Sequence, residues 1–396
     1  MVMKMAQHRK KKRKFKVNFS NFLTIFEIVL AIAIFFALFS FASAKLGITS
    51  VSDVVDSFSN FFRTLSPGEG YPYKINSSSV KDIEVLNGNI YVLLDDKTLT
   101  LDKTAKEVKI SSLTYSTPAF AVKGGRAVVF NRNGNRYRIE NRTDILHSGE
   151  TNEEEKIITA ALSRKGMLAL ATLCKDARSK LTVLNSSYKK EVFVWKCAQD
   201  SIVSVDLSSN GRYAAVAVVG ARDGEMFSKV YTFDFKYAEP IAEFEYPKTA
   251  ILSVRFSSND NVVAIGDNLI SFIKDLKKVE NKNFGTSTLV NFTYSDRGDT
   301  ILVLSEYGST NSQILTAYSS SFNVNFEEKF DSNIKDIFAA DGKVNVLLED
   351  KVIVFRSGGT KYKEYSADTN SISVLNIGNK TYVYAIGKIV KCTESK

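Results

Sequence analysis

Short apolar runs separated by polar turns fill this chain between residues 80 and 380. Eight of these turns are tight links between two runs of alternating apolar and polar residues, and they recur about once every 40 residues. The turns lie at Gly88, Gly125, Gly166, Gly211, Asp260, Gly298, Gly342 and Gly378. The steps between them are 37, 41, 45, 49, 38, 44 and 36 residues. This spacing predicts an all-β protein, a β-propeller in which each repeat is one four-stranded blade.

Two distant segments resemble one another closely. Residues 82–101 (DIEVLNGNIYVLLDDKTLTL) and 336–355 (DIFAADGKVNVLLEDKVIVF) agree at several positions, among them Asp82 with Asp336 and Gly88 with Gly342. The agreement indicates an internal repeat. The runs that follow the turns are apolar on both faces, as expected for strands that lie between two neighbouring blades.

The pattern divides into eight blades, at roughly 80–115, 116–152, 153–199, 200–249, 250–287, 288–332, 333–368 and 369–396. The last blade has only about three strands, whereas Tyr71–Ile75 (YPYKI) has strand character and no blade of its own. We therefore expect the N-terminal strand to complete the last blade, which removes exposed edges from the ring. A seven-bladed propeller is the alternative, if residues 116–152 are irregular.

Residues 22–44 form an apolar run of 23 residues with one charge. As a helix it is roughly 34 Å long, enough to cross a membrane. The basic stretch His8–Lys16 (HRKKKRKFK) precedes it, so the positive-inside rule places residues 1–21 in the cytoplasm as a basic tail. A cleaved signal peptide is the alternative, because Ala42-Ser43-Ala44 has the form of a cleavage site. In both cases the propeller, residues 71–396, is exported.

Residues 45–70 link the predicted span to the propeller. Apolar residues recur there at helical spacing from Val51 to Leu65, and Pro67 and Gly68 end the pattern. This predicts a short amphipathic helix.

Charge is concentrated in the N-terminal tail. Eight basic residues and one acidic residue before Lys45 contribute +7 of the formal +10, which leaves +3 for residues 45–396. A basic stripe over the globular surface, which nucleic acid requires, is not indicated. We therefore expect a membrane association and no nucleic-acid partner.

The Ser-x-x-Gly turn followed by an Ala/Val-rich strand resembles the turn repeat of WD40-like bacterial propellers. The chain departs from their Ser-Pro-Asp-Gly motif because it lacks the proline. Together with the basic tail, the single span and the segment SSNGRYAAVAVVGARDGEMFSKVYTF (208–233), it is similar to a family of uncharacterised, single-pass, membrane-anchored envelope proteins of clostridia-like bacteria. The resemblance covers nearly the whole chain and implies the anchor and the fold. It implies no activity and no functional residues.

Catalytic and cofactor motifs are scarce in this sequence. The two histidines are His8, in the tail, and His147, and neither belongs to a triad or a zinc-type cluster. A calcium loop, a P-loop and a dinucleotide fingerprint are absent from the sequence. Quinone-dependent propellers generally pack their blades with several tryptophans, and this chain has only Trp195. We expect no metal and no cofactor.

The cysteines leave two readings open. Cys174 and Cys197 are expected to end the second and fourth strands of one blade, on the same rim, about 9–10 Å apart. They either form a disulfide through loop bending or remain buried thiols.

Loop length points to a binding surface. In a four-stranded blade the a–b turns lie on one rim, and the b–c and d–a links lie on the other. The b–c links are long in three blades, at 174–180, 220–229 and 305–313. Long loops on a rigid scaffold often carry binding residues. The contact candidates are Arg178, Arg222, Asp223, Met226, Phe227 and Tyr307. The alternative is that the three long links are passive insertions.

We therefore expect a non-enzymatic binding or scaffold module, held in the cell membrane by one span and displayed outside the cytoplasm to an envelope protein or a wall polymer. Two alternatives stay open. One is an envelope hydrolase, which acid pairs converging in the central channel would favour. The other is a sensor subunit that works with a second membrane protein.

Overall fold

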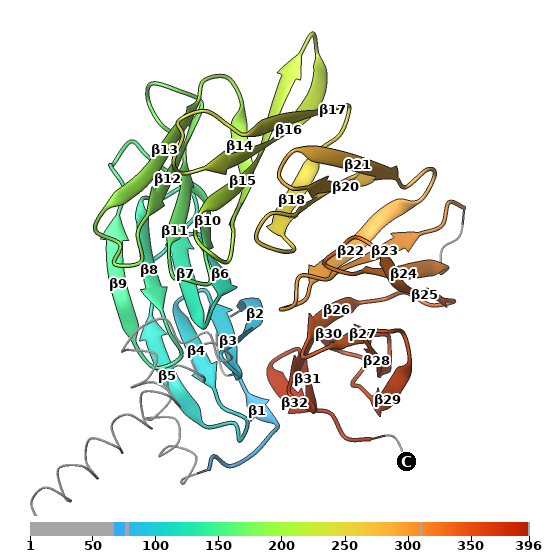
Figure 1. Cartoon of the computed structure of the whole chain (residues 1–396). Helices are drawn as coiled ribbons and strands as arrows, with labels where there is room; N and C mark the ends of the chain where they lie inside the picture. The colour runs from blue at the N-terminus through green and yellow to red at the C-terminus, as the bar shows by residue number, and fades with distance from the viewer. Residues whose placement is uncertain (1–66, 76–78, 309–310, 395–396) are drawn as a thin grey trace, which may run out of the picture. The chain divides into compact units, whose positions relative to one another are not determined.

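The computed structural model describes residues 67–75, 79–308 and 311–394, and within them it contains strands and turns. The predicted tail, the predicted span and the predicted helix between Val51 and Leu65 lie outside these residues. Within the described ranges no helix is long and apolar enough to cross a membrane. Figure 1 shows the strands grouped into sheets that are arranged radially around a common centre.

The strands form eight antiparallel sheets of four strands each, which confirms the eight-bladed propeller. Blade 1 has β2 (Val80–Leu86), β3 (Asn89–Leu94), β4 (Lys97–Leu101) and β5 (Glu107–Ser112); blade 2 has β6 (Pro118–Lys123), β7 (Arg126–Asn131), β8 (Arg136–Glu140) and β9 (Ile145–Glu150). Blade 3 has β10 (Ile157–Leu162), β11 (Leu168–Thr172), β12 (Ser179–Leu184) and β13 (Glu191–Cys197); blade 4 has β14 (Ser201–Leu207), β15 (Tyr213–Arg222), β16 (Glu225–Asp234) and β17 (Ala242–Pro247).

Blade 5 has β18 (Ile251–Phe256), β19 (Val262–Gly266), β20 (Leu269–Lys274) and β21 (Lys278–Asn283); blade 6 has β22 (Thr288–Tyr294), β23 (Thr300–Ser305), β24 (Gln313–Tyr318) and β25 (Val324–Phe330). Blade 7 has β26 (Asp336–Ala340), β27 (Lys343–Leu347), β28 (Lys351–Arg356) and β29 (Lys361–Ser366). Blade 8 has β30 (Ser371–Ile377), β31 (Lys380–Ala385), β32 (Lys388–Lys391) and β1 (Tyr73–Lys74). Because blade 2 is a regular four-stranded sheet, the seven-bladed alternative is wrong.

The N-terminal strand closes the ring as predicted. Tyr73 of β1 pairs with Ile389 of β32, and the Ile75 amide donates to the Gly387 carbonyl at 2.9 Å. Figure 1 shows blue β1 beside red β32. One apolar cluster crosses the closure, since Tyr382 of blade 8 packs with residues of blade 1 such as Ile90. The two ends of the domain are thereby held together.

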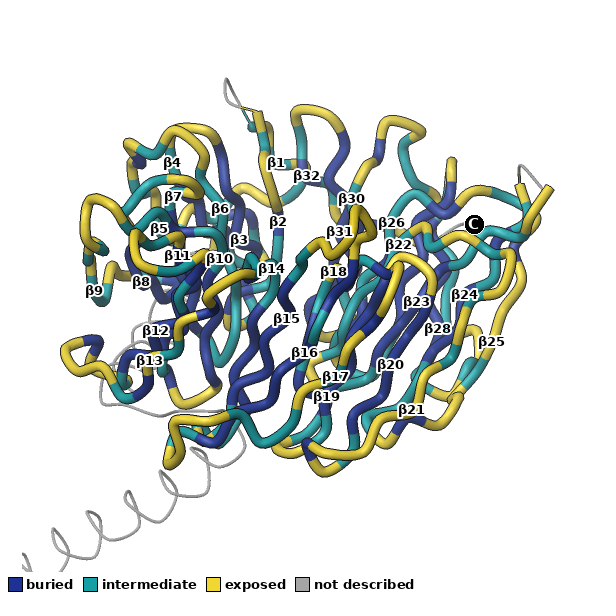
Figure 2. The backbone as a smooth tube through the Cα atoms, turned by 90° about the horizontal axis from the view of Figure 1, so that it is seen from above, coloured by how far each residue is buried: buried dark blue, intermediate teal, exposed yellow. Residues whose placement is uncertain are grey.

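Burial follows the position of each strand in its blade. All six residues of β3 are buried, because its two faces contact neighbouring blades. Five of the six residues of the outermost strand β21 are exposed. Figure 2 shows this gradient, with dark blue in the middle strands and yellow in turns and outer strands. The core is thus a ring of apolar layers between blades.

The short turns have the backbone that their sequences predict. The two-residue turn between β2 and β3 has φ of 48° at Asn87 and 75° at Gly88. Positive φ at both central positions is the type I′ hairpin geometry, and Asn and Gly tolerate it best. Because the four strands of a blade run antiparallel in chain order, the a–b turns all lie at one end of the propeller, the a–b rim. The b–c and d–a links lie at the other end, the b–c rim.

Candidate functional site

The predicted long loop of blade 4 is a protruding hairpin. Strands β15 and β16 pair as far as Arg222 and Glu225, and only Asp223 and Gly224 form the turn, with φ of 54° and 79°. The expectation of a loop over 220–229 is therefore wrong. Asp-Gly favours a two-residue type I′ turn, so the strands continue to the tip. Figure 1 shows this hairpin extending beyond its neighbours.

The candidate residues of the hairpin differ in how far they are exposed. Phe227 is 7% exposed, so its ring is a packing element and not a contact surface, whereas Met226 is 41% exposed. The Arg222 guanidinium lies over the Phe227 ring, 4.8 Å from its centroid. Arg222 also forms an ion pair with Glu245 of β17 at 3.2 Å. The tip is thereby fixed to the outer strand of its blade.

The other two candidates lie on separate blades. Arg178, on the b–c link of blade 3, donates from Nε to Ser201 Oγ at 2.9 Å, so it joins blade 3 to β14 of blade 4. Tyr307, on the b–c link of blade 6, is 84% exposed. The structure brings Arg178 and the hairpin onto adjacent blades, and blade 5 separates Tyr307 from them. Ligand binding by these residues stays a prediction.

Cys174, Cys197 and Cys392 are all free thiols, so the first two form no disulfide in this structure. Cys197 belongs to the apolar layer between blades 3 and 4. Cys174 lies beyond the end of β11, and its thiol donates to the Ala177 carbonyl of its own loop at 3.4 Å. The two side chains thus occupy different surroundings, one the core and one the rim.

The central channel, which the eight innermost strands surround, holds a group of charged residues that sequence reasoning missed. In six blades the innermost strand has an irregularity near the b–c rim that leaves one residue out of the pairing. A polar residue follows each irregularity: Asp82, Thr159, Ser204, Ser253, Asn291 and Ser373. Asp336 begins the innermost strand of blade 7.

Three carboxyl groups share the entrance of the channel. Asp336 accepts a hydrogen bond from Ser373 Oγ at 2.8 Å and one from the Val374 amide at 2.9 Å, so it satisfies an edge amide of β30. Desolvation raises the pKa of Asp336. Desolvation raises the pKa of Asp82 as well, and the charge of Asp336 adds to this rise.

Glu84 lies one layer deeper, and its pKa is raised further than the pKa values of Asp82 and Asp336. Desolvation raises its pKa to about 7, with further contributions from Asp82 and Asp336, whereas the Val85 amide and Arg255 act in the opposite direction. Since these residues come from blades 1, 5 and 7, their side chains face one another across the channel. Carboxyl groups with raised pKa values in a shared concave site are candidates for function, and also occur in structural networks.

A second group lies nearer the a–b rim. The Lys123 ammonium of blade 2 donates to Asp206 of blade 4 at 2.8 Å and to the Leu207 carbonyl at 2.8 Å. Arg255 of blade 5 lies 3.8 Å from the same carboxylate. Desolvation lowers the pKa of Lys123 to about 8 although Asp206 favours its charged form. The side chain of Lys123 therefore connects blade 2 to blade 4 across the inner end of blade 3.

The a–b end of the channel is crossed by a further side chain. Arg164, in the a–b turn of blade 3, donates from Nη2 to the Asp296 carbonyl of blade 6 at 3.2 Å. Together with the Lys123 bridge, this contact obstructs the channel from the a–b rim. Asp82 and Asp336 lie on the b–c side of these contacts, at the start of their strands.

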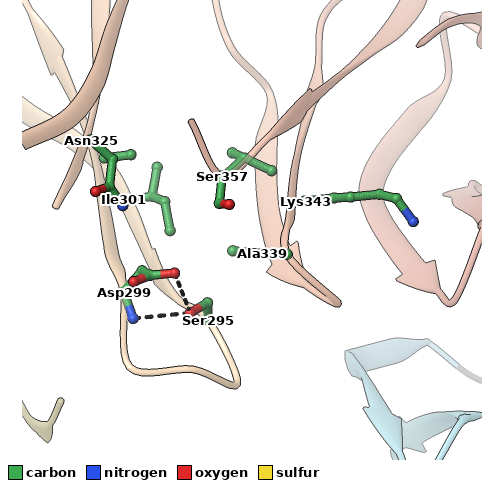
Figure 3. Close-up of a pocket in the computed structure, with 10 residues that line it drawn as sticks. Ser295, Asp299, Ile301, Asn325, Ala339, Lys343 and Ser357 are labelled. Carbon is green, nitrogen blue, oxygen red and sulfur yellow. Dashed lines mark hydrogen bonds between the residues drawn. The ribbon is translucent and has the colours of Figure 1, made fainter. Parts of the chain in front are cut away.

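A small pocket lies between blades 6 and 7 (Figure 3). Ser295, Asp299, Ala339 and Ser357 line it, and the Lys343 ammonium points away toward the Gly378 carbonyl, 2.7 Å from it. Asp299 and Ser295 hydrogen-bond to each other, so these polar groups already have partners. In the part of the chain that the structure describes, no three His, Cys, Asp or Glu side chains are placed to hold a metal ion.

One sequence signal for the channel existed. Asp82 and Asp336 are matched positions of the internal repeat, and a step from an apolar residue to Asn, Ser or Thr recurs near the start of five of the innermost strands and marks the polar layer. Which of these side chains meet depends on the closure of the ring.

Comparisons with known proteins support the fold. Residues 71–391 match the model of a family described as a family of unknown function, DUF5711. No curated protein matches the chain.

Several solved structures are similar in fold. The C-terminal WD40 domain of Sif2 is 11% identical with a TM-score of 0.54, over 83% of this chain and 99% of that one. Sqt1 of Saccharomyces cerevisiae is 9% identical with a TM-score of 0.54, over 82% and 98%. The quinohemoprotein alcohol dehydrogenase ADHIIG of Pseudomonas putida HK5 is 10% identical with a TM-score of 0.52, over 80% and 71%. At such identities the likeness shows the propeller architecture alone.

Proposed function

The chain belongs to the DUF5711 family of unknown function, and we propose that it is a binding module, anchored in the cell membrane by residues 22–44, whose propeller holds an envelope protein at the b–c rim outside the cytoplasm. The basic stretch before the apolar run supports this orientation. The propeller architecture that the chain shares with the WD40 domain of Sif2 is compatible with such a role, because one fold can carry many functions.

The distribution of exposed apolar side chains carries the proposal. Thirteen large apolar side chains are exposed in the described residues. Seven belong to the b–c end, five lie on outermost strands, and one, Tyr237, lies on a link at the a–b end. The seven are Leu173, Met226, Leu252, Val290, Tyr307, Ile372 and Ile386. Aromatic residues and Met are enriched at protein interfaces, which favours a protein partner over a wall polymer.

The experiment compares the two ends of the propeller. The full chain, solubilised from membranes after crosslinking in intact cells, is purified and its partners are identified by mass spectrometry. Tyr307→Asp, at the b–c end, is expected to reduce recovery of a specific envelope partner at least about fivefold, because a charge replaces an exposed ring in a desolvated contact. Tyr237→Asp, 65% exposed on the opposite end, is the matched control.

Two outcomes would contradict the proposal. Equal loss in both variants, or in neither, means that the b–c end is not the binding face. Protease added to intact cells must also cleave the propeller, since protection there places it in the cytoplasm.

A second candidate function rests on one observation. Asp82, Glu84 and Asp336 converge in the channel, and paired carboxyl groups with raised pKa values are what a hydrolase uses. If the protein is an envelope hydrolase, Glu84→Gln abolishes turnover of a wall-derived glycan or peptide.

A further inference from the structure

An apolar collar surrounds the entrance of the channel. The residue left out of the pairing is Ile158 in blade 3, Val203 in blade 4, Leu252 in blade 5, Val290 in blade 6 and Ile372 in blade 8. We call these five residues the collar. In blade 1 the equivalent residue is Lys81, which forms an ion pair with Asp95 at 2.8 Å.

Three of the five collar residues are exposed because of their backbone. Leu252, Val290 and Ile372 are 49%, 44% and 53% exposed, whereas Ile251, directly before Leu252, is 2% exposed. An extra residue in one strand re-aims the local side chains, so Leu252, Val290 and Ile372 point out of the inter-blade core, whereas Ile158 and Val203 stay partly buried and Val203 packs against the core between blades 4 and 5. Single exposed apolar residues are ordinary on protein surfaces. Branched aliphatic residues nevertheless recur at this one position in five blades, and three of them are exposed at the same end of the propeller.

The layer beneath the collar carries negative charge. Asp82 and Asp336 lie directly beyond it, Glu84 lies one layer deeper, and no Lys or Arg of the described ranges forms an ion pair with any of the three within 4.0 Å. Lys335, next to Asp336, pairs with Glu349 at 2.9 Å and donates to the Thr369 carbonyl at 2.7 Å. The entrance thus combines apolar surface with carboxylates that lack a cation.

Polar side chains and one arginine face these carboxylates from the neighbouring blades. Ser373 and Asn291 hydrogen-bond to Asp336, and Arg255 lies deeper, beside the Lys123–Asp206 bridge. The deeper cations are shared with Asp206, and the a–b end is obstructed by Arg164. A ligand that approaches Asp82 and Asp336 from the b–c end passes the collar residues of the neighbouring blades.

We propose that the collar and the carboxylates beneath it bind a segment of the partner protein in which a lysine or arginine lies between apolar residues. The apolar neighbours contact the collar, and the cationic group enters the channel and pairs with Asp82 and Asp336. This inference rests on the proposed function, because it names the chemistry of the partner at the same rim. Charge complementarity decides the occupant, since an acidic or wholly apolar segment leaves the carboxylates unpaired.

Acidity of the medium weakens this binding. The pKa of Glu84 is raised to about 7, and the pKa values of Asp82 and Asp336 are raised from their ordinary values. Protonation on going from pH 8 to pH 5.5 removes negative charge from the channel, while lysine stays charged throughout this range. The loss of affinity therefore reports the carboxyl groups and not the ligand.

The test uses the full chain in detergent and immobilised pentapeptides of the form acetyl-Gly-Leu-X-Val-Gly-amide. The position X is Lys, Arg, norleucine or Glu. Lys and Arg are expected to bind at least about tenfold better than norleucine at pH 8, and this ratio is expected to be smaller at pH 5.5. The double variant Asp82→Asn/Asp336→Asn removes the preference for Lys and Arg.

Apolar contacts are tested separately. Val290→Ser is expected to weaken binding of all four peptides at least about threefold. Val279→Ser is the matched control, because Val279 is equally exposed, 44%, on the outermost strand β21. Circular dichroism and melting curves show that each variant keeps its β structure.

The outcomes separate this inference from the function on which it rests. No preference for Lys or Arg, a preference that survives the double variant, or equal effects of Val290→Ser and Val279→Ser overturns the inference. If the Tyr307→Asp experiment still shows a partner at the b–c rim, the proposed function survives that result. If no partner is recovered either, both fail.

Discussion

The buried charge network between blades 1 and 2 permits a quantitative prediction. Glu140 of β8 is fully buried and accepts hydrogen bonds from Tyr91 Oη at 2.8 Å and from Lys109 Nζ at 2.6 Å. Arg138 Nε forms an ion pair with the same carboxylate, and Thr98 Oγ1 donates to it at 3.1 Å. The side chains of Lys109 and Arg138 are each 8% exposed. One anion therefore neutralises two cations that are almost removed from water.

Glu140→Gln retains the size of the side chain and removes its charge. Breaking a buried ion pair by removing one partner costs about 3–5 kcal/mol, because it leaves a buried charge uncompensated. Lys109 keeps its bond to the Asn141 carbonyl at 2.9 Å, and Arg138 keeps its bond to the Ser112 carbonyl at 2.7 Å. These remaining acceptors favour the lower end, about 3 kcal/mol. An unfolding entropy of about 0.7 kcal/mol/K for roughly 330 residues then lowers Tm by about 4 °C.

Thermal and urea unfolding, followed by circular dichroism, check this value against a matched surface pair. Glu150 of β9 forms an ion pair with Arg136 at 3.2 Å, and both side chains are more than half exposed. Glu150→Gln is expected to change stability by less than about 0.5 kcal/mol. A Tm decrease below about 1 °C for Glu140→Gln, or equal decreases for the two variants, would refute the reasoning that burial makes this pair costly to break.

Three further predictions concern the channel, the ring closure and the hairpin. Because the pKa of Glu84 is raised, the native state binds more protons than the unfolded chain at pH values between the ordinary pKa of a glutamate and about 7, so the stability of the protein falls as the pH rises through that window. Glu84→Gln is expected to remove this fall, which melting curves recorded from pH 4.5 to 8 will show. A pH dependence of Tm that is the same in the variant and the native protein contradicts the prediction. Tyr71→Ala removes a ring whose centroid lies 5.0 Å from that of Tyr382, and it removes a hydrogen bond to blade 1. It should therefore lower the free energy of unfolding, measured in urea, by about 2–4 kcal/mol. A decrease under about 1 kcal/mol would mean that the ring closure does not determine the stability of the propeller. Phe227→Ala is expected to cost about 3 kcal/mol, whereas Met226→Ala on the exposed tip should change stability by less than about 0.5 kcal/mol; equal effects would place both residues at the surface.

The number and order of blades could be predicted from the sequence because their determinants are local. Turn residues such as Asn87-Gly88 favour a hairpin wherever they occur, and apolar runs such as Asn89–Leu94 identify strands with two covered faces. The short last blade and the unassigned strand at Tyr71–Ile75 together predicted the closure, because an open ring would leave two edges exposed.

The hairpin of blade 4 shows where the local pattern misleads. Its polar tip from Gly220 to Lys229 has the composition of a loop, yet cross-strand pairing and the burial of Phe227 extend both strands to the Asp223-Gly224 turn. A polar sequence in a protruding hairpin differs from the same sequence in a loop only because its backbone hydrogen-bonds to the neighbouring strand. The sequence of the segment alone does not show that pairing.

The channel depended on the tertiary structure throughout. Asp82 and Asp336 are 254 positions apart in the chain, and Lys123 and Asp206 are 83 apart, yet each pair shares one narrow space. Every blade contributes a single edge to that space, so the raised pKa of Glu84, the group of carboxylates without an ion pair and the collar exist only after the ring has closed. Strands and blades follow from neighbours along the chain, whereas the chemistry of the channel follows from neighbours across it.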